Sequence, residues 1–540
     1  MGWRAGHLGD CRPMEQGAPT RSRTWWRRFA PGLVTFVLLA AVQCCWALAL
    51  PRNAGPDEPS HDRKAAAVVR GQLRGPHVVG YPDGMRQVLV PGELAGRFYP
   101  CFAFAPRTTA ACQERVHSGG VQGQGTTAGK YPPLPYVPAG LAGFARSGYR
   151  LAYAMRIGQA LATAALVAWA AQVLFRVRRG ALARAGLLFA LTPTAVFVSS
   201  VVNPNGIEAA ASVLAWAAGL VLAFDDGPPR RADVVAFATG ASVMTLTRTL
   251  SPVWLGVMLG VLVIVAPRAR RAALLGDTDV RWCGLGLVVA VAGQVGWIVW
   301  SGLAHAVDPA VAQHYSTAEL ARILVGRPWL LYRQLVGQFG WYEVNAPPLT
   351  IVAWTTALGL FVGGALLVAR RRVVLAVLAV VGVTVVVPAL VDGVEASRAG
   401  LVWQGRYSLP LVGGLTILAG FELGRSRMPA DVERRLLALV GAAFAVAHVS
   451  GFVWALRRYM VGIDGRVWFW SGAGWRPPVS VAALLVVQPL AVVALAWYTL
   501  HTPGRATPVD HRRHDPYLTM AAIDPSDDRR QELAMNEIVP

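Results

Sequence analysis

Long apolar runs separated by short polar segments set the pattern of this chain. A helix that crosses the hydrocarbon core of a bilayer needs about 20 mostly apolar residues, and many runs here approach or exceed that length. We predict twelve membrane-spanning helices, at 29–50, 151–175, 182–200, 207–224, 233–249, 252–267, 283–303, 348–369, 373–391, 407–424, 435–456 and 479–500. The predicted fold class is an all-α polytopic membrane protein.

The polar segments divide the chain into an N-terminal tail (1–28), a multi-span domain (29–500) and an Arg- and Asp-rich C-terminal tail (501–540), expected to be disordered. The first apolar run exceeds the roughly 7–15-residue core of a signal peptide and has no clear cleavage site, so we interpret it as a retained anchor. The first loop, 51–150, is too long for a simple connection. The loop at 304–347 has apolar residues near helical spacing, which favours a helix along the membrane surface.

Charge gives the expected orientation. The chain is 54% hydrophobic and 15% charged, with a net charge of +21. Basic clusters recur in alternate connections, at 27–28, 176–184, 228–231, 267–271, 370–372 and 424–435. Because cytoplasmic loops carry the excess of Lys and Arg, these segments and both termini are predicted to be cytoplasmic. The same distribution argues against a nucleic-acid partner and favours membrane lipid as the surroundings.

Two pairs of spans are joined by very short connections, VVNPNG (201–206) and RTLSP (248–252). Asn-Pro and Ser-Pro break helices, so each pair is expected to form a tight hairpin. Either hairpin could be partly re-entrant, provided that its non-helical backbone is buried in protein or lines a wet cavity.

Two of the six cysteines, Cys101 and Cys112, lie in the first loop. If that loop is outside the cytoplasm, where disulfides persist, a disulfide between them is expected.

The first loop begins PRNAGPDEPSHDRK (51–64), which sets Asp57 and Glu58 between prolines at the predicted membrane surface. A carboxylate at the edge of a low-dielectric cavity can act as a general base, or can hold a divalent cation beside a phosphate. The alternative is the capped start of a helix, where acidic residues suit the helix dipole. Composition alone favours the cap.

Two arginines oppose the orientation rule, because they stand at the predicted outer ends of spans. Arg248 ends the run MTLTR, and Arg406 lies in LVWQGRYSLP beside Gln404. A guanidinium suits bidentate binding of phosphate, although each could instead pair with an outer acid. Asn203, Asn205 and Glu208, in VVNPNGIE, lie at a predicted outer hairpin tip, and Glu208 is one such acid.

The segment GQFGWYEVNAPP (337–348) places Trp341 and Tyr342 at the outer surface. Aromatic residues there are commonly interfacial anchors, although aromatics beside an acid also line sugar-binding clefts. Other classes find little support, since the sequence has no Walker A loop, no GxSxG and no HExxH. The spans also lack the chain of buried acids typical of an ion-coupled transporter.

Several motifs occur together and in order along the chain. They are PDEPSHDRKAAAVVRGQL, KYPPLPYVPAGLAGF, LTPTAVFVSSVVNPNGIEAAAS, GQFGWYEVNAPP and QGRYSLPLV. The set resembles the bacterial polytopic membrane family known as domain of unknown function two-one-four-two. That family in turn resembles the GT-C glycosyltransferases, which use polyprenyl-phosphate-linked sugars.

The resemblance implies a GT-C-like membrane domain in a bacterial plasma membrane, with an acidic catalytic motif directly after the first span, here Asp57 and Glu58. The family's basic residue in a late outer loop falls on Arg406, and Arg248 stands where relatives carry Lys-Pro. The implied activity is sugar transfer from a polyprenyl phosphate to a glycan acceptor in cell-envelope synthesis. A transporter or flippase, and a non-catalytic assembly partner for lipid-linked glycans, remain the alternatives.

Overall fold

The structure is a computed structural model that describes residues 21–78, 84–114, 116, 119–303, 313 and 315–504. The predictions for the C-terminal tail and for the first 20 residues of the N-terminal tail fall outside these residues. The first helix, α1 (Arg21–Ala49), starts eight residues before the predicted span at 29–50.

Helices dominate, and each of the twelve predicted spans coincides with one helix or, at 182–200, with two. Among the described residues, nine helices are long and apolar enough to cross a membrane. These are α1, α4 (Arg150–Leu174), α7 (Pro204–Phe224), α11 (Thr278–Ser301), α13 (Pro348–Val368), α14 (Arg371–Ala399), α15 (Leu409–Arg425, with the preceding 3-10 turn η6, Gly405–Ser408), α16 (Ala430–Val461) and α17 (Val481–His501). The all-α polytopic fold class is confirmed.

The predicted span at 182–200 is two helices, α5 (Ala181–Ala190) and α6 (Pro193–Ser199), bent by 65°. Pro193 has no backbone N–H to continue the first helix and is well placed to begin the second. The Thr192 hydroxyl accepts a hydrogen bond from the Ala195 amide at 3.0 Å, which caps α6. The bend therefore has a local cause in the Thr-Pro pair, and together α5 and α6 could make a tenth span.

The helices α8 (Arg231–Thr245) and α9 (Ser251–Val265) have 15 residues each. Such a helix rises about 22 Å, less than the roughly 30 Å of a hydrocarbon core. The spans predicted at 233–249 and 252–267 are therefore shorter than a full crossing, and the turn that contains Arg248 joins them. The hairpin packs closely on α7: a Cβ on Gly240 of α8 would lie 2.6 Å from the Ala215 amide nitrogen of α7.

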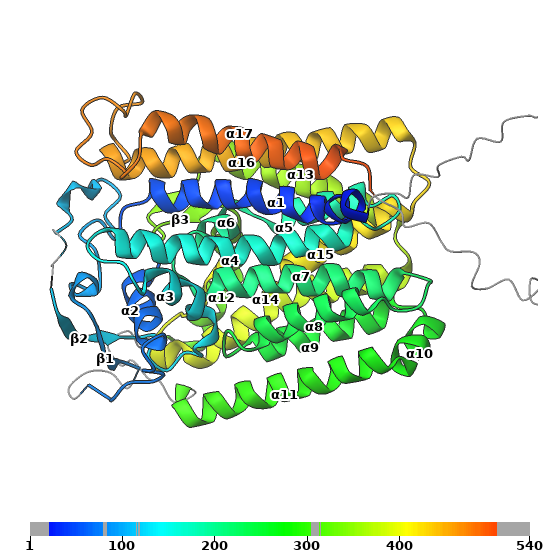
Figure 1. Cartoon of the computed structure of the whole chain (residues 1–540), viewed down its shortest axis with the longest axis horizontal. Coiled ribbons are helices and arrows are strands. Elements are labelled where there is room, and N and C mark those ends of the chain that lie inside the picture. Colours follow the sequence, from blue (N-terminus) through cyan, green and yellow to red (C-terminus); the bar gives the residue numbers. More distant parts are fainter. Residues whose placement is uncertain are drawn as a thin grey trace, which may run out of the picture. The chain divides into compact units, whose positions relative to one another are not determined.

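The first loop forms a cap over one end of the helices, which we call the site end (Figure 1). It contains α2 (Glu58–Val68), α3 (Val137–Gly143) and the antiparallel strands β1 (Arg86–Pro91) and β2 (Val121–Thr126), in register from Arg86↔Thr126 to Pro91↔Val121. Every residue of α2 is buried, including its charged ones.

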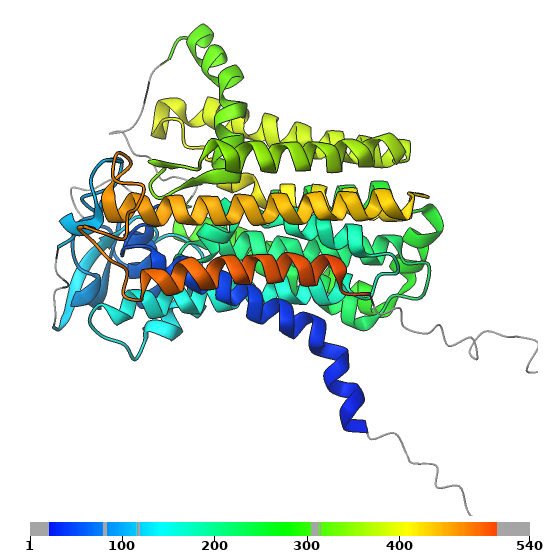
Figure 2. The same cartoon turned by 90° about the horizontal axis from the view of Figure 1, so that it is seen from above.

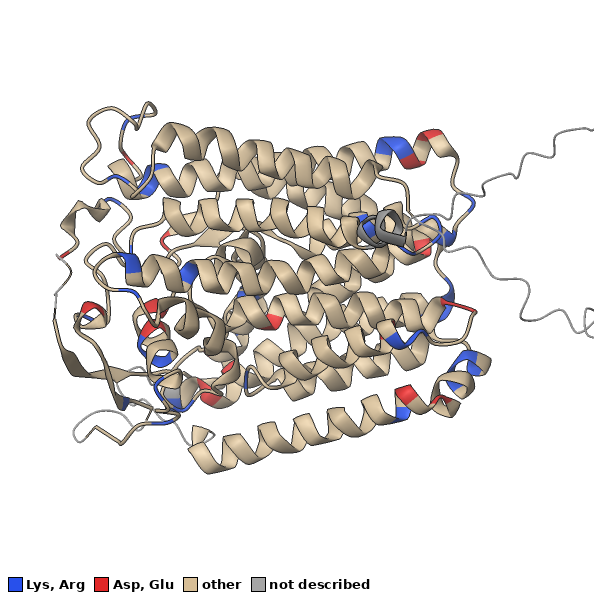
Figure 3. Cartoon of the chain, viewed as in Figure 1, with Lys and Arg blue, Asp and Glu red and all other residues tan. Residues whose placement is uncertain are grey.

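The opposite end, which we call the α10 end, carries the short helix α10 (Arg268–Gly276). A separate helix, α12 (Thr317–Gly337), occupies part of the loop predicted at 304–347. Figure 2 shows the long helices side by side from a second direction. Charged residues gather at the two ends, with a mostly uncharged band between them (Figure 3). That band is what a helical membrane protein requires.

Candidate functional site

The adjacent carboxylates Asp57 and Glu58 go to different partners. Asp57 stands at the N-cap position of α2, but its side chain caps no backbone amide, and its backbone is left-handed, with φ of 59°. Its Oδ2 instead accepts a hydrogen bond from Arg406 Nη2 at 3.0 Å, and 39% of the side chain is exposed. The alternative interpretation, in which the Asp57 side chain caps a helix, is therefore wrong.

Glu58 is enclosed. Its two oxygens accept hydrogen bonds from Nε and Nη2 of Arg156 at 2.6 and 2.7 Å, and both side chains are only 1% exposed. The amides of Gly55 and Val202 also point at this carboxylate, at 2.8 and 3.4 Å. Arg156 further donates to three backbone carbonyls where α1 ends. Glu58 thus holds the start of the loop against α4.

Arg248 and Arg406 converge on one acceptor, Asn205. Arg248 Nη1 lies 2.8 Å from Asn205 Oδ1, and Arg406 Nε lies 3.2 Å from the same atom. The side-chain nitrogen of Asn205, Nδ2, donates to Glu208 Oε2 at 3.4 Å, which turns the side-chain oxygen towards the arginines. Ser251 donates to the other oxygen of Glu208 at 2.7 Å. Glu208 is therefore connected to Arg248 through Asn205.

Aromatic rings line the two guanidinium groups. The Tyr407 ring lies 4.3 Å from the Arg248 guanidinium and 5.2 Å from that of Arg406. The Tyr342 hydroxyl accepts a hydrogen bond from Arg406 Nη1 and donates to Gln404 Oε1 at 2.5 Å. Tyr131 lies 5.9 Å from Arg248. Such rings stabilise cations in a partly dry environment.

We name this group the arginine cluster, and it consists of Asp57, Tyr131, Asn205, Arg248, Tyr342, Gln404, Arg406 and Tyr407. Arg406 is only 3% exposed, whereas the Asp57 side chain is 39% exposed. The cluster is positive enough to affect its surroundings: burial, together with the charges of Arg406 and Arg248, holds the pKa of His61 well below its usual value.

Two predicted site residues lie beside the cluster and support it. Asn203 caps α7 and donates through Nδ2 to the Pro56 carbonyl at 3.0 Å, which fixes the peptide just before Asp57. Trp341 donates to the Asn53 carbonyl at 2.9 Å and packs against Tyr99 with ring centroids 5.3 Å apart. These two residues position the loop that carries Asp57.

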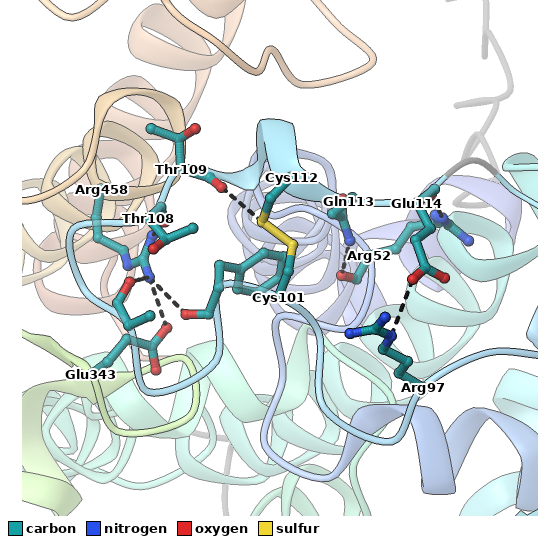
Figure 4. Close-up of a disulfide and its surroundings, with 12 residues drawn as sticks. Arg52, Arg97, Cys101, Thr108, Thr109, Cys112, Gln113, Glu114, Glu343 and Arg458 are labelled. Carbon is teal, nitrogen blue, oxygen red and sulfur yellow. Dashed lines mark hydrogen bonds and ion pairs between the residues drawn. A yellow bond between two sulfur atoms is a disulfide. The ribbon is translucent and has the colours of Figure 1, made fainter.

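The disulfide that the sequence allows is present between Cys101 and Cys112 (Figure 4). Arg458 of α16 holds the loop closed by this disulfide, because it donates to the carbonyls of Phe102, Ala105 and Thr108 at 2.7–3.0 Å. Arg458 also lies 3.7 Å from Glu343, the residue after Tyr342. Burial raises the pKa of Glu343 to about 6. The disulfide loop and the segment that holds Tyr342 are thus tied to the same arginine.

Sequence reasoning missed Arg156, Tyr131 and the contacts of Tyr407. The signal for Arg156 was available, since it is an arginine inside an apolar run, where charged residues are costly and normally paired. Tyr131 carried no such signal, because it stands in a proline-rich stretch and approaches Arg248 only in the folded chain.

The possible divalent cation fits this site poorly. Among the residues that the structure describes, no three His, Cys, Asp or Glu side chains come close enough to hold a metal ion. The partner of Asp57 is a guanidinium, and a second guanidinium lies across Asn205.

The fold and the arginine cluster define a helical polytopic membrane protein with a polar site at one end of its helices. The chain belongs to the family described as "Predicted membrane protein (DUF2142)", which matches residues 40–415 and includes every member of the cluster. The family resemblance is thereby confirmed. Among solved structures, the chain is similar to ArnT from Cupriavidus metallidurans in the apo state, with 16% identity, 89% of this chain and 78% of that chain covered, and a TM-score of 0.42. No curated protein matches the chain.

Proposed function

We propose that this protein is a membrane glycosyltransferase that takes a sugar from a polyprenyl phosphate and passes it to a hydroxyl of a glycan acceptor. It would act at the outer face of a bacterial plasma membrane, with both termini in the cytoplasm. The observation that carries the proposal is the convergence of Arg248 and Arg406 on Asn205 Oδ1, beside the carboxylate of Asp57.

Two guanidinium groups that share one neutral acceptor are a receptor for a doubly charged oxyanion. Guanidinium groups bind phosphate oxygens through paired hydrogen bonds, and burial strengthens the interaction. Asn205 Oδ1 marks the point on which both side chains converge, so a phosphate oxygen approaching there would meet both cations. Tyr342 adds a hydroxyl on the Arg406 side. This arrangement suits a departing polyprenyl phosphate, whose negative charge grows as the sugar leaves.

Asp57 is placed to act as the general base. It would take the proton from the acceptor hydroxyl while that oxygen forms a bond to the anomeric carbon of the sugar. The bond between this carbon and the phosphate oxygen breaks, and the electron pair leaves with the polyprenyl phosphate. With no substrate bound, Arg406 neutralises Asp57. An arriving phosphate would attract Arg406 and leave the carboxylate free to accept a proton.

Glu58 takes a different part in this proposal. Its carboxylate is filled by four donors, so it positions the Asp57 peptide rather than reacting. Gln404 orients Tyr342, and Asn205 orients the two arginines. Trp341 supports the loop by its hydrogen bond to the Asn53 carbonyl.

The test uses the purified protein in lipid nanodiscs. Radiolabelled undecaprenyl-phosphate-linked pentose and hexose are added with membranes from a strain that lacks the protein, and label is followed from the lipid into the glycan fraction. We expect transfer with the wild type and a loss of about 10²–10⁴-fold in Asp57→Asn, the usual contribution of a general base. Asp464→Asn is the matched control, since Asp464 is an exposed acid paired with Arg107 in the described chain.

Arg406→Gln should also abolish transfer and weaken binding of undecaprenyl phosphate itself. Wild-type transfer that is unchanged by Asp57→Asn and by Arg406→Gln would overturn the proposal. Movement of the intact labelled lipid between leaflets, with no label in glycan, would instead favour the flippase alternative.

A further inference from the structure

A long apolar groove lies on the membrane-facing side of the protein, away from the arginine cluster. Its floor is α7 and α8, its walls are α9 and α11, and α10 closes it at the α10 end. It has a volume of about 1070 Å³, above the roughly 300–1,000 Å³ of ordinary ligand pockets. Apart from two arginines its lining is almost wholly apolar, with Phe237, Leu259 and Leu287 among the larger side chains.

The groove exists because α11 stands apart from α9. Only 17% of the apolar stretch of α11 is buried, the lowest share among the candidate spans in the described chain. Gly284 of α11 helps to keep the channel open, because a larger side chain at this position would enter it. A Cβ on Gly284 would meet no atom within 4 Å. Protein side chains therefore leave this space to an apolar occupant.

The groove is long enough for the tails of a lipid in one leaflet of a bilayer. Its lining on α11 runs from Val280 to Val295. Fifteen residues of helix rise about 22 Å, whereas half of a hydrocarbon core is roughly 15 Å. The tails of a lipid whose headgroup lies at α10 would therefore fit within the groove.

The mouth of the groove is basic. Arg268 and Arg271 line it, and neither forms an ion pair within the part of the chain that the structure describes. Their neighbour Arg270 is buried and donates to the carbonyls of Leu222 and Gly227 at 2.6 and 2.5 Å, which ties α10 to the end of α7. The fold therefore holds the other two guanidinium groups at the entrance, where a lipid phosphate would lie.

We propose that this groove binds an anionic phospholipid of the leaflet at the α10 end, with its acyl chains between α9 and α11 and its phosphate at Arg268 and Arg271. The occupant also bears on the site, because Gln294 of α11 donates to the Arg248 carbonyl at 3.0 Å. The bound lipid would supply the packing that α11 lacks on its α9 side.

The experiment is native mass spectrometry of the full chain in detergent, with added dioleoyl-phosphatidylglycerol or dioleoyl-phosphatidylcholine. The wild type should retain phosphatidylglycerol in preference to phosphatidylcholine. The double variant Arg268→Gln/Arg271→Gln should lower retention of phosphatidylglycerol about tenfold to thirtyfold, from the usual attraction of two basic side chains to anionic lipid. Arg434→Gln/Arg435→Gln, on exposed arginines at the start of α16, is the control and should retain the lipid.

A second pair of variants tests the groove itself. Gly284→Phe places a ring in the channel, whereas Gly286→Phe, also on α11 with no atom within 4 Å of its Cβ, lies outside the lining. Loss of lipid in the first and retention in the second supports the proposal. Equal retention of the two lipids by the wild type, equal retention by both glycine variants, or dependence on Arg248 instead of Arg268 and Arg271, would overturn it.

Discussion

Neutralising Glu58 should make the protein much easier to unfold, and neutralising its neighbour Asp57 should have a smaller effect. Four donors point at the Glu58 carboxylate, and two of them belong to Arg156, which is only 1% exposed. Glu58→Gln leaves one oxygen for these donors, sets an amide group against a guanidinium and leaves a buried positive charge uncompensated. Breaking such a buried pair costs about 3–5 kcal/mol. The three carbonyls that Arg156 also contacts should keep the loss near the lower figure.

Asp57→Asn removes one ion-pair contact from a side chain that is 39% exposed. Water screens an ion pair with a partly exposed member, and Arg406, which is only 3% exposed, keeps its contacts with Asn205 Oδ1 and the Tyr342 hydroxyl. The loss of folding free energy should therefore be smaller than that of Glu58→Gln. The assay is unfolding in mixed micelles with increasing denaturing detergent, followed by circular dichroism. Arg156→Met with Glu58→Gln completes a double-mutant cycle and should recover part of the loss. Equal stability of Glu58→Gln and Asp57→Asn would refute the assignment of Glu58 to structure.

Three further outcomes follow from the contacts above. Burial lowers the pKa of Lys64 from 10.5 to about 7. Between these two pH values the unfolded chain binds a proton at Lys64 that the folded chain has lost, so this residue makes the free energy of unfolding rise by about 1.4 kcal/mol per pH unit from pH 7 to pH 10. Lys64→Met should remove that slope from a series of unfolding curves. Replacing both Cys101 and Cys112 with Ser should lower the stability of the non-reduced protein by roughly 2–4 kcal/mol and make it insensitive to reductant, measured by the same unfolding assay. If the proposed function holds, Tyr342→Phe should raise the KM for the labelled lipid donor about tenfold with a smaller change in kcat, since the lost hydroxyl contacts Arg406, the proposed phosphate ligand. An unchanged KM would remove Tyr342 from donor binding.

Much of the arginine cluster could be predicted from the sequence because its members break one-dimensional rules. Arg248 and Arg406 stand at span ends where basic residues are disfavoured, and Asn205 follows a helix-breaking proline. Those rules mark the residues but not their partners. Adjacent side chains such as Asp57 and Glu58 look equivalent in sequence, and only the left-handed backbone at Asp57 sends them in different directions.

The helices show the same division between local and tertiary information. Hydropathy located all twelve apolar segments, since burial in lipid depends on local composition. It did not predict that 182–200 bends by 65°, although Thr192 and Pro193 carry a local signal for it. The groove between α9 and α11 has no counterpart in the sequence pattern, because it depends on how far apart two apolar helices stand.

The arginine cluster also imposes an order on biogenesis, because its acid and its main cation are made far apart in time. Asp57 and Arg406 are separated by 349 residues. At about 5–20 residues per second, a ribosome needs roughly 20–70 s to add them. Cys101 and Cys112 are only 11 residues apart, so their disulfide can form before the later helices enter the membrane. The cluster is completed only when the segment before α15 arrives, and a nascent chain carries an unneutralised Asp57 until then.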